Sequence, residues 1–386
     1  MSLLARIARV FSAALPLLCL GLATGVQADW PMHRGNPQLN GVSSMEAAVV
    51  PKEVWTFSAG KPVKGGAAIA HGRVYVGDEA GVVHAVDLEK GLERWSFKTE
   101  AAVEATPLVL GKRLFVGSND GKLYALDAES GEALWSYLTD DKIIGGPNTC
   151  KNPDGTADWI IFGSYDSKLH CVDAATGKVM WTFQTDNYIN GTPALLPGGE
   201  VIFGGCDSML RIVSVADGTQ ARQIEAEAYV ASSVAVAEDG KAYVGHYGNV
   251  VIGMDPKEAS ILWKYRARQF PYLSSAAVTN ARVVIGGGDK RLHCIERATG
   301  KPAWEFATRG KVDGSPVVCA DTVVFGSMDG RLYGVALEDG VERWAYDLGS
   351  PVAASPAVSE GWIIVGTEDG IAVSYTHLTL PTKRIV

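Results

Sequence analysis

The chain has few positive charges and few cysteines, and each shortage narrows what the protein can be. Its 35 Lys and Arg residues are outnumbered by 43 Asp and Glu residues, which gives a formal net charge of −8, and no basic stripe appears after residue 28. Because phosphate backbones require a basic surface, we expect no nucleic-acid partner. Five cysteines follow residue 28, an odd number at irregular spacing, which does not predict a disulfide framework.

A run long and apolar enough to predict a membrane span is also missing. The apolar stretch at 10–23 is too short, so we expect no transmembrane segment after signal cleavage. Arg6 and Arg9 precede this stretch, and Val26-Gln27-Ala28 follows it as a small-x-small cleavage site. Residues 1–28 are therefore predicted to be a cleavable signal peptide, with a retained anchor as the alternative.

Cys19 raises the question of a lipid anchor. A lipid-attachment site normally has a small residue immediately before the cysteine, whereas this chain has Leu18 there. We therefore expect no lipoprotein anchor, and we predict that the mature chain is periplasmic or secreted.

Glycine, by contrast, is abundant at 44 residues, and it marks a repeat that governs the whole chain. The clearest unit is Gly117-Ser-Asn-Asp-Gly-Lys-Leu-Tyr-Ala-Leu-Asp127, followed by Gly131 and Trp135. Matching units begin at Gly77, Gly117, Gly163, Gly204, Gly245, Gly286, Gly326 and Gly366. Because successive starts are 40 to 46 residues apart, the chain is predicted to contain eight copies of one supersecondary unit.

Each unit predicts four antiparallel strands. In the seventh unit the strand-like runs are 314–318, 322–325, 331–335 and 341–344. Asp-Gly dipeptides between them are strong hairpin signals, because such turns need positive φ. Four strands per unit, with no helical periodicity, are typical of a propeller blade. We therefore predict an all-β, eight-bladed β-propeller over residues 51–373, preceded by a leader segment at 29–50.

A tryptophan recurs eighteen residues after the first glycine in six of the units: Trp95, Trp135, Trp181, Trp263, Trp304 and Trp344. A large ring that recurs once per blade is best explained by packing on the adjacent blade. Arg222 stands at this position in the fourth unit, so we expect the weakest joint there. A second glycine, fourteen residues after the first, is replaced by Ala259 and Leu380.

The two ends of the array complement each other. Trp55-Thr-Phe57 is a tryptophan strand with no hairpin before it, whereas the hairpin at Gly366 has no tryptophan strand after it. The N-terminal strand is therefore predicted to complete the last blade, with Trp55 as a seventh docking tryptophan. We expect the closed ring to be monomeric.

The repeat stops in mid-strand after Val373. The positions that should carry Asp, Gly and Trp hold Thr376, Leu380 and Arg384. Residues 374–386 look like the translated adapter sequence that sometimes ends gene models from fragmentary assemblies, so this tail is predicted to be non-native.

The pattern Ala-x-Asp-x-x-x-Gly-x-x-x-Trp, present at 85–95 and 125–135, resembles the tryptophan-docking repeat of the pyrroloquinoline-quinone-like (PQQ-like) propellers. The segment Asp29-Trp-Pro-Met-His-Arg-Gly35 looks like the leader that these proteins carry before their first blade. Two branches share the repeat: the quinoprotein dehydrogenases, and the outer-membrane assembly factor BamB with its relatives. The repeat is a signal of fold and does not choose between them.

The quinoprotein branch implies PQQ with Ca²⁺, a catalytic Asp and usually two adjacent cysteines. No two cysteines of this chain are adjacent, and the repeats have almost no insertions beyond 152–155. We therefore expect no cofactor, no metal site and no catalytic residue. The sequence favours a non-catalytic, BamB-like scaffold that binds protein partners in the cell envelope, as in outer-membrane protein assembly. The alternatives are a binding module for a polar ligand or a sugar, and a PQQ-dependent quinoprotein oxidoreductase.

Two groups of residues are candidate contacts. Four polar residues from separate blades directly precede a small-residue element at the start of the blade: Lys64, Glu104, Asn190 and Asp313. They either line a central channel or belong to a solvated rim. A loop with one cation and two aromatic rings contains Arg268, Phe270 and Tyr272. Such a loop suits a protein contact surface, or it is an ordinary packed turn.

Overall fold

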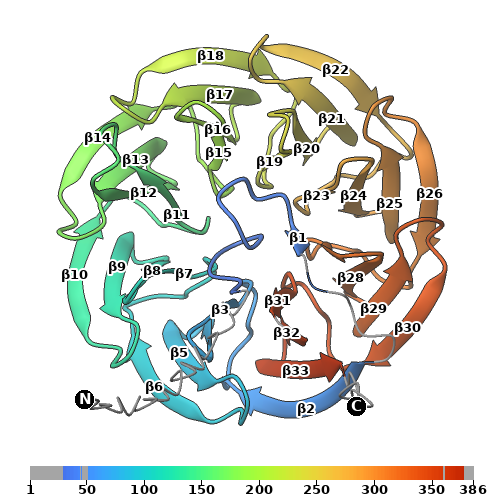
Figure 1. The fold of residues 1–386 in the computed structure, drawn as a ribbon, viewed down its shortest axis with the longest axis horizontal. Helices are drawn as coiled ribbons and strands as arrows, with labels where there is room; N and C mark the ends of the chain where they lie inside the picture. The colour runs from blue at the N-terminus through green and yellow to red at the C-terminus, as the bar shows by residue number, and fades with distance from the viewer. Residues whose placement is uncertain (1–28, 44, 46–50, 360, 378–386) are drawn as a thin grey trace, which may run out of the picture.

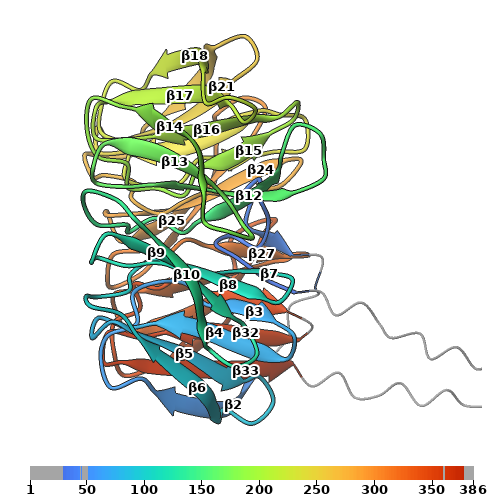
Figure 2. The same cartoon turned by 90° about the vertical axis from the view of Figure 1, so that its left-hand side faces the viewer.

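Eight sheets, seven of four strands and one of five, lie around a central axis in the computed structural model, which describes residues 29–43, 45, 51–359 and 361–377 (Figure 1). The predicted all-β, eight-bladed propeller is confirmed. In side view the ring is a thick disc (Figure 2). The described residues form no helix that is long and apolar enough to cross a membrane. The predicted signal peptide, 1–28, lies outside the described residues.

Seven blades are formed by consecutive strands, which run from the axis to the circumference in chain order (Figure 1). Blades 1 and 2 contain β3 (Ala68–Ala70), β4 (Arg73–Gly77), β5 (Val82–Asp87) and β6 (Glu93–Lys98), then β7 (Leu108–Leu110), β8 (Arg113–Gly117), β9 (Lys122–Asp127) and β10 (Ala133–Leu138). Blades 3 and 4 contain β11 (Asn148–Lys151), β12 (Asp158–Gly163), β13 (Lys168–Asp173) and β14 (Val179–Gln184), then β15 (Ala194–Leu196), β16 (Glu200–Gly204), β17 (Met209–Ser214) and β18 (Gln220–Glu225). Blades 5 and 6 contain β19 (Ala235–Val236), β20 (Ala242–His246), β21 (Val250–Asp255) and β22 (Ser260–Tyr265), then β23 (Ala277–Val278), β24 (Arg282–Gly287), β25 (Arg291–Glu296) and β26 (Pro302–Ala307). Blade 7 contains β27 (Val317–Cys319), β28 (Thr322–Ser327), β29 (Arg331–Ala336) and β30 (Glu342–Asp347), and β1 (Val42–Ser43) of the leader joins its inner edge.

Blade 8 combines the two ends of the chain. It contains β31 (Ala357–Ser359), β32 (Trp362–Gly366) and β33 (Ile371–His377), and β2 (Pro51–Ser58) is its outermost strand. The β2–β33 ladder runs from Pro51 opposite His377 to Ser58 opposite Ile371, which confirms that the N-terminal strand closes the last blade. Residues 374–377, which were assigned to the predicted non-native tail, lie in β33, and 378–386 lie outside the described residues.

The core consists of the two middle strands of every blade, and both faces of these strands are covered by neighbouring blades. In blade 2 the middle strands are Arg113–Gly117 and Lys122–Asp127, and four consecutive residues of each are buried. A strand that is covered on both faces has no polar side, so the apolar residues run continuously rather than alternating. The outermost strands alternate between exposed and partly buried residues, because one of their faces meets solvent.

The recurring tryptophans pack on the recurring glycines of the next blade. A Cβ atom at Gly131, where φ is +77°, would lie 2.6 Å from the Trp95 ring, so only glycine permits this approach. The same contact joins Trp55 to Gly91, Trp135 to Gly177, Trp181 to Gly218, Trp263 to Gly300 and Trp304 to Gly340. Several indoles also donate a hydrogen bond to the next blade, as Trp181 does to the Val215 carbonyl at 2.8 Å.

Blade 4 replaces the indole by a guanidinium. Arg222 Nε donates to the Pro256 carbonyl of blade 5 at 2.9 Å, and Nη2 forms an ion pair with Glu200. Ala259 stands where the other blades have glycine, with φ +49°. Because no ring lies on this position, its Cβ is tolerated. The two departures from the repeat are therefore linked: Arg222 supplies no indole to blade 5, and so position 259 does not need to be glycine.

We expect Arg222→Trp alone to destabilise the ring by about 1–3 kcal/mol, because the new indole would overlap the Cβ of Ala259. Adding Ala259→Gly should remove the loss, with a coupling energy of about 0.5–3 kcal/mol in a double-mutant cycle. Urea unfolding of the four proteins measures this coupling. Additive effects of the two substitutions would contradict the packing rule.

Candidate functional site

The leader crosses the middle of the ring and closes one end of the central channel (Figure 1). Its main-chain carbonyls accept hydrogen bonds from the inner strands of five blades, at Val109, Leu195, Val236, Val278 and Val318. Trp30 exchanges two main-chain bonds with Ile69 of blade 1, and Val42 pairs in parallel with Val318. Except for β27, which pairs with β1, these inner strands have no partner strand on the channel side within the described residues, so the leader satisfies N–H groups that would otherwise be unpaired.

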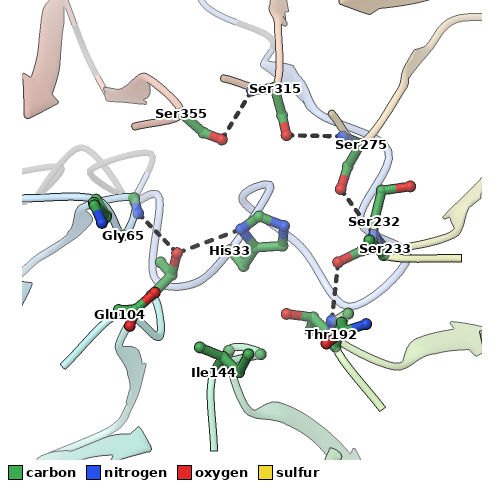
Figure 3. Close-up of a pocket in the computed structure, with 18 of the residues that line it drawn as sticks. His33, Gly65, Glu104, Ile144, Thr192, Ser232, Ser233, Ser275, Ser315 and Ser355 are labelled. Carbon is green, nitrogen blue, oxygen red and sulfur yellow. Dashed lines mark hydrogen bonds between the residues drawn. The ribbon is translucent and has the colours of Figure 1, made fainter. Parts of the chain in front are cut away.

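The other end of the channel opens to a cavity with a volume of about 170 Å³ (Figure 3). His33 of the leader lies at its centre in this view, and the walls come from the residues that precede the inner strands. Lys64, Glu104 and Asn190 are among these lining residues. We call the face of the ring that carries this opening the open face, and the face that carries the leader the closed face.

Small residues line the cavity because neighbouring blades approach each other most closely near the axis. A Cβ atom on Gly191 would lie 2.6 Å from the Ser232 carbonyl oxygen, and one on Gly65 would lie 2.7 Å from that of Glu104. Side chains are therefore excluded from these positions. The next residue is Ser or Thr in six blades and Gly in the other two, at Gly66 and Gly146, so this position holds nothing larger than a small hydroxyl side chain.

Those hydroxyls link one blade to the next. The N–H of Thr192 donates to Ser233 Oγ at 2.9 Å, that of Ser233 to Ser275 Oγ at 3.0 Å, that of Ser275 to Ser315 Oγ at 2.9 Å, and that of Ser315 to Ser355 Oγ at 3.0 Å (Figure 3). Gly66 donates in the same way to Thr106 Oγ1 at 3.0 Å. The residues predicted to line the channel lie two positions earlier in the chain, and this series was not predicted, although the small-residue element recurs in every unit.

The leader brings one unmatched positive charge to the axis. Arg34 is 1% exposed, and its Nη2 donates to the carbonyls of Ala276 at 3.0 Å and Pro316 at 2.6 Å. Its Nε and Nη1 have no hydrogen-bond partner among the described residues. Burial lowers the pKa of Arg34 to about 9, so the group remains a cation at neutral pH. Burial and the charge of Arg34 lower the pKa of His33 to about 3, so its imidazole is neutral.

The four predicted channel residues have different surroundings. Lys64 forms an ion pair with Glu79, which raises its pKa, and Glu104 accepts a bond from Asn119 at 2.7 Å. Asn190 donates to Cys206 Sγ at 3.0 Å. Asp313 does not line the cavity; it is half-buried, and burial raises the pKa of its carboxyl group.

The predicted contact loop divides into buried and exposed residues. Tyr272 is 2% exposed and meets His293 edge to face at 5.3 Å, so it belongs to the core between blades. Arg268 lies 3.4 Å from Asp289 and 3.6 Å from Glu305. Phe270 is 50% exposed. The structure therefore places one of the three, Phe270, as a free apolar side chain.

Phe270 belongs to a larger set, which we call the aromatic arc: Tyr165, Tyr188, Tyr229, Tyr247 and Phe270. These residues lie in loops and hairpins of the open face, from blade 3 to the start of blade 6. Tyr188, Tyr229 and Tyr247 are 45%, 54% and 51% exposed. The rings of Tyr165 and Tyr188 stack at 4.7 Å, and the Lys142 ammonium lies 4.5 Å from the Tyr165 ring centre.

Sequence reasoning found Phe270 and missed the four tyrosines. The signal in the sequence that could have found them is that they recur at two fixed positions of the repeat. Tyr188 and Tyr229 occupy one position of the repeat, and Tyr165 and Tyr247 occupy another, as the matching bonds from Cys206 to Tyr188 and from Tyr247 to Tyr229 show.

The residues around the cavity do not fit a calcium–quinone pair. Calcium takes about 6–8 oxygen ligands, commonly including several carboxylates. Among the described residues that line the cavity, Glu104 is the one carboxylate, and Asn119 already donates to it. The described part of the chain contains no group of three or more His, Cys, Asp or Glu placed to hold a metal. The cavity is also smaller than the about 300–1,000 Å³ of a typical small-molecule site.

Comparison with known proteins identifies one family and two kinds of structural neighbour. The family model described as outer membrane protein assembly factor BamB matches residues 47–151, 145–275 and 270–379. No curated protein matches the sequence. BamB from Moraxella catarrhalis has a similar structure, with TM-score 0.70 and 17% identity over 86% of this chain and 98% of that one.

Enzymes share the fold as well. Quinohemoprotein alcohol dehydrogenase from Comamonas testosteroni has TM-score 0.77 and 13% identity over 90% of this chain and 80% of that one. A europium-containing methanol dehydrogenase has TM-score 0.75 and 14% identity over 91% of this chain and 98% of that one. At these identities the likeness shows the fold, and the fold is common to both classes.

Proposed function

The chain belongs to the family of outer membrane protein assembly factor BamB, and from this premise we propose that it is a non-catalytic scaffold of the cell envelope that binds another protein through its open face. The predicted signal peptide and the family support a periplasmic location. The absence of a calcium-type donor set among the residues that line the cavity supports a binding role rather than quinone chemistry.

The aromatic arc is the observation that carries this proposal. Aromatic side chains are enriched in protein interfaces, and they supply much of the binding energy there. A surface that exposes several of them together is the kind of patch that marks an interaction site on a soluble protein. Here Tyr188, Tyr229, Tyr247 and Phe270 are each about half exposed.

The remainder of the open face is charged, which indicates the chemistry of the partner. Lys64 interacts electrostatically with Glu79, Glu104 and Glu368, and Asp313 interacts with Glu368 and Lys311. Among these six residues, four carboxylates and two ammonium groups leave an acidic excess. We therefore propose a partner segment that places apolar or aromatic side chains on blades 3–6 and basic side chains on blades 7, 8, 1 and 2.

We expect the variant Tyr188→Ser, Tyr229→Ser, Phe270→Ser to lose its partner while its fold is unchanged, because these side chains are largely in solvent. The tagged protein, cross-linked in its native host and isolated from the envelope fraction, should recover components of outer-membrane protein assembly. Recovery by the triple variant should fall by about tenfold or more, which corresponds to a loss of about 1.4 kcal/mol or more of binding free energy over the three side chains.

A matched control comes from the closed face. Leu92 and Val341 are each 61% exposed and follow the turns between third and fourth strands, which lie on the opposite face because successive antiparallel connections alternate. The variant Leu92→Ser, Val341→Ser should recover the same components as the wild type. Equal recovery by the triple variant, or loss in the control, would refute the open face as the binding surface.

A further inference from the structure

The central cavity contains hydrogen-bond donors that lack acceptors. Ser233, Ser275, Ser315 and Ser355 each use Oγ to accept an N–H from the preceding blade, so their hydroxyl hydrogens stay available for another bond. Among the described residues, no acceptor of these four hydrogens is found. All four residues line the cavity, and their hydroxyls lie around its wall (Figure 3).

A positive charge is buried behind this ring of donors, outside the residues that line the cavity. Arg34 Nη2 donates hydrogen bonds to the carbonyls of Ala276 and Pro316. These two residues immediately follow Ser275 and Ser315. No carboxylate of the described chain forms an ion pair with Arg34, and two of its nitrogens are buried without a partner. Burying an unpaired charge is costly, and a counter-charge in the cavity would offset that cost.

We propose that the central cavity is a binding site for one small oxyanion, phosphate or sulfate, held by the hydroxyls of Ser233, Ser275, Ser315 and Ser355 beside the guanidinium of Arg34. Oxyanions accept several hydrogen bonds at once, and charge-assisted bonds are the stronger kind. The volume of about 170 Å³ admits one such ion with a few waters.

The test is a titration of the mature protein with sodium phosphate and with sodium sulfate in a chloride buffer, followed by isothermal calorimetry and thermal unfolding. We expect one ion per chain and a melting temperature that rises with the logarithm of ion concentration once the site is filled. Sodium chloride at equal ionic strength should produce neither effect. A melting temperature and heat that do not distinguish phosphate or sulfate from chloride would overturn the proposal.

Two variants separate this site from ion binding elsewhere. Ser275→Ala with Ser315→Ala should weaken the affinity about tenfold or more, because two donors are removed. Ser274→Ala is the matched control: it removes a hydroxyl that accepts the Gly286 N–H at 2.8 Å but does not line the cavity, so its affinity should equal that of the wild type. Equal affinity in the double variant and the control would assign the ion to another surface and refute the proposal.

Arg34→Met gives an independent readout. Without added ion this variant loses the hydrogen bonds to the Ala276 and Pro316 carbonyls but no longer buries an unpaired charge, so its own melting temperature is the reference for any gain with ion. With phosphate, the wild type should gain stability and the variant should not. A variant that gains as much as the wild type would show that Arg34 has no part in the site.

Discussion

Deleting residues 51–58 should unfold the whole ring rather than loosen one blade. The deletion removes the outermost strand of blade 8, its ladder to β33, and the Trp55 indole that packs on Gly91 of blade 1. It also removes the bond from Trp55 Nε1 to the Leu88 carbonyl at 2.8 Å. The indole alone is worth about 3–5 kcal/mol, and a whole domain has about 5–15 kcal/mol to lose. Circular dichroism should show no cooperative melting transition for the deletion.

Trp55→Ala is the control that separates the indole from the strand. It keeps the β2–β33 ladder and removes the contact with blade 1, so it should fold and lose about 3–5 kcal/mol in urea unfolding. If the deletion instead melts with one sharp transition near that of the wild type, closure of the ring must not depend on β2.

Trp181→Ala should destabilise the protein by about 3–5 kcal/mol, the usual cost of truncating a buried tryptophan. Trp181 is 9% exposed, lies on Gly218 of blade 4 and donates to the Val215 carbonyl. The substitution leaves a cavity at the joint between blades 3 and 4 and an unpaired carbonyl. Urea unfolding monitored by circular dichroism measures the loss, and a change below about 1 kcal/mol would show that the indole does not hold the joint.

Trp135→Ala offers a comparison within the same ring. Trp135 lies on Gly177 in the same way, but its Nε1 has no hydrogen-bond partner among the described residues. Its truncation should therefore cost about 1 kcal/mol less than that of Trp181, which is the typical net value of one hydrogen bond. If the two variants lose equal free energy of unfolding, the contribution of the indole comes from packing and not from the hydrogen bond.

The fold could be predicted from the repeat because the same residue types occupy the same packing positions in most blades. Eight glycine-initiated units predicted eight blades. An unmatched tryptophan strand at one end of the array and an unmatched hairpin at the other predicted that β2 completes blade 8. The fourth unit also yielded a physical rule. Ala259 replaces glycine where Arg222 replaces tryptophan, and the sequence alone recorded these as two separate exceptions.

The parts that could not be predicted occur once, or depend on the main chain. The leader binds the inner strands through carbonyls, which every residue possesses, so no pattern of side chains reveals its path. Arg34 is a single residue with no counterpart to compare, and nothing in its neighbours in sequence indicates that it is buried. The tyrosines of the aromatic arc do recur at two positions of the repeat, but their exposure depends on how the blades are arranged.

The β2–β33 ladder also determines when the ring can close during synthesis of the chain. Ser58 pairs with Ile371, so β2, which is synthesised early, cannot pair until β33 has been synthesised. At about 5–20 residues per second, the intervening stretch takes roughly 15–65 s to synthesise. Until then the backbone edge of β2 has no partner, and the most distant contact of the ring is the last that can form. A nascent or truncated chain therefore differs from a finished one in that the edge of β2 is exposed. Chaperones and proteases can recognise the unpaired N–H and C=O groups of this edge.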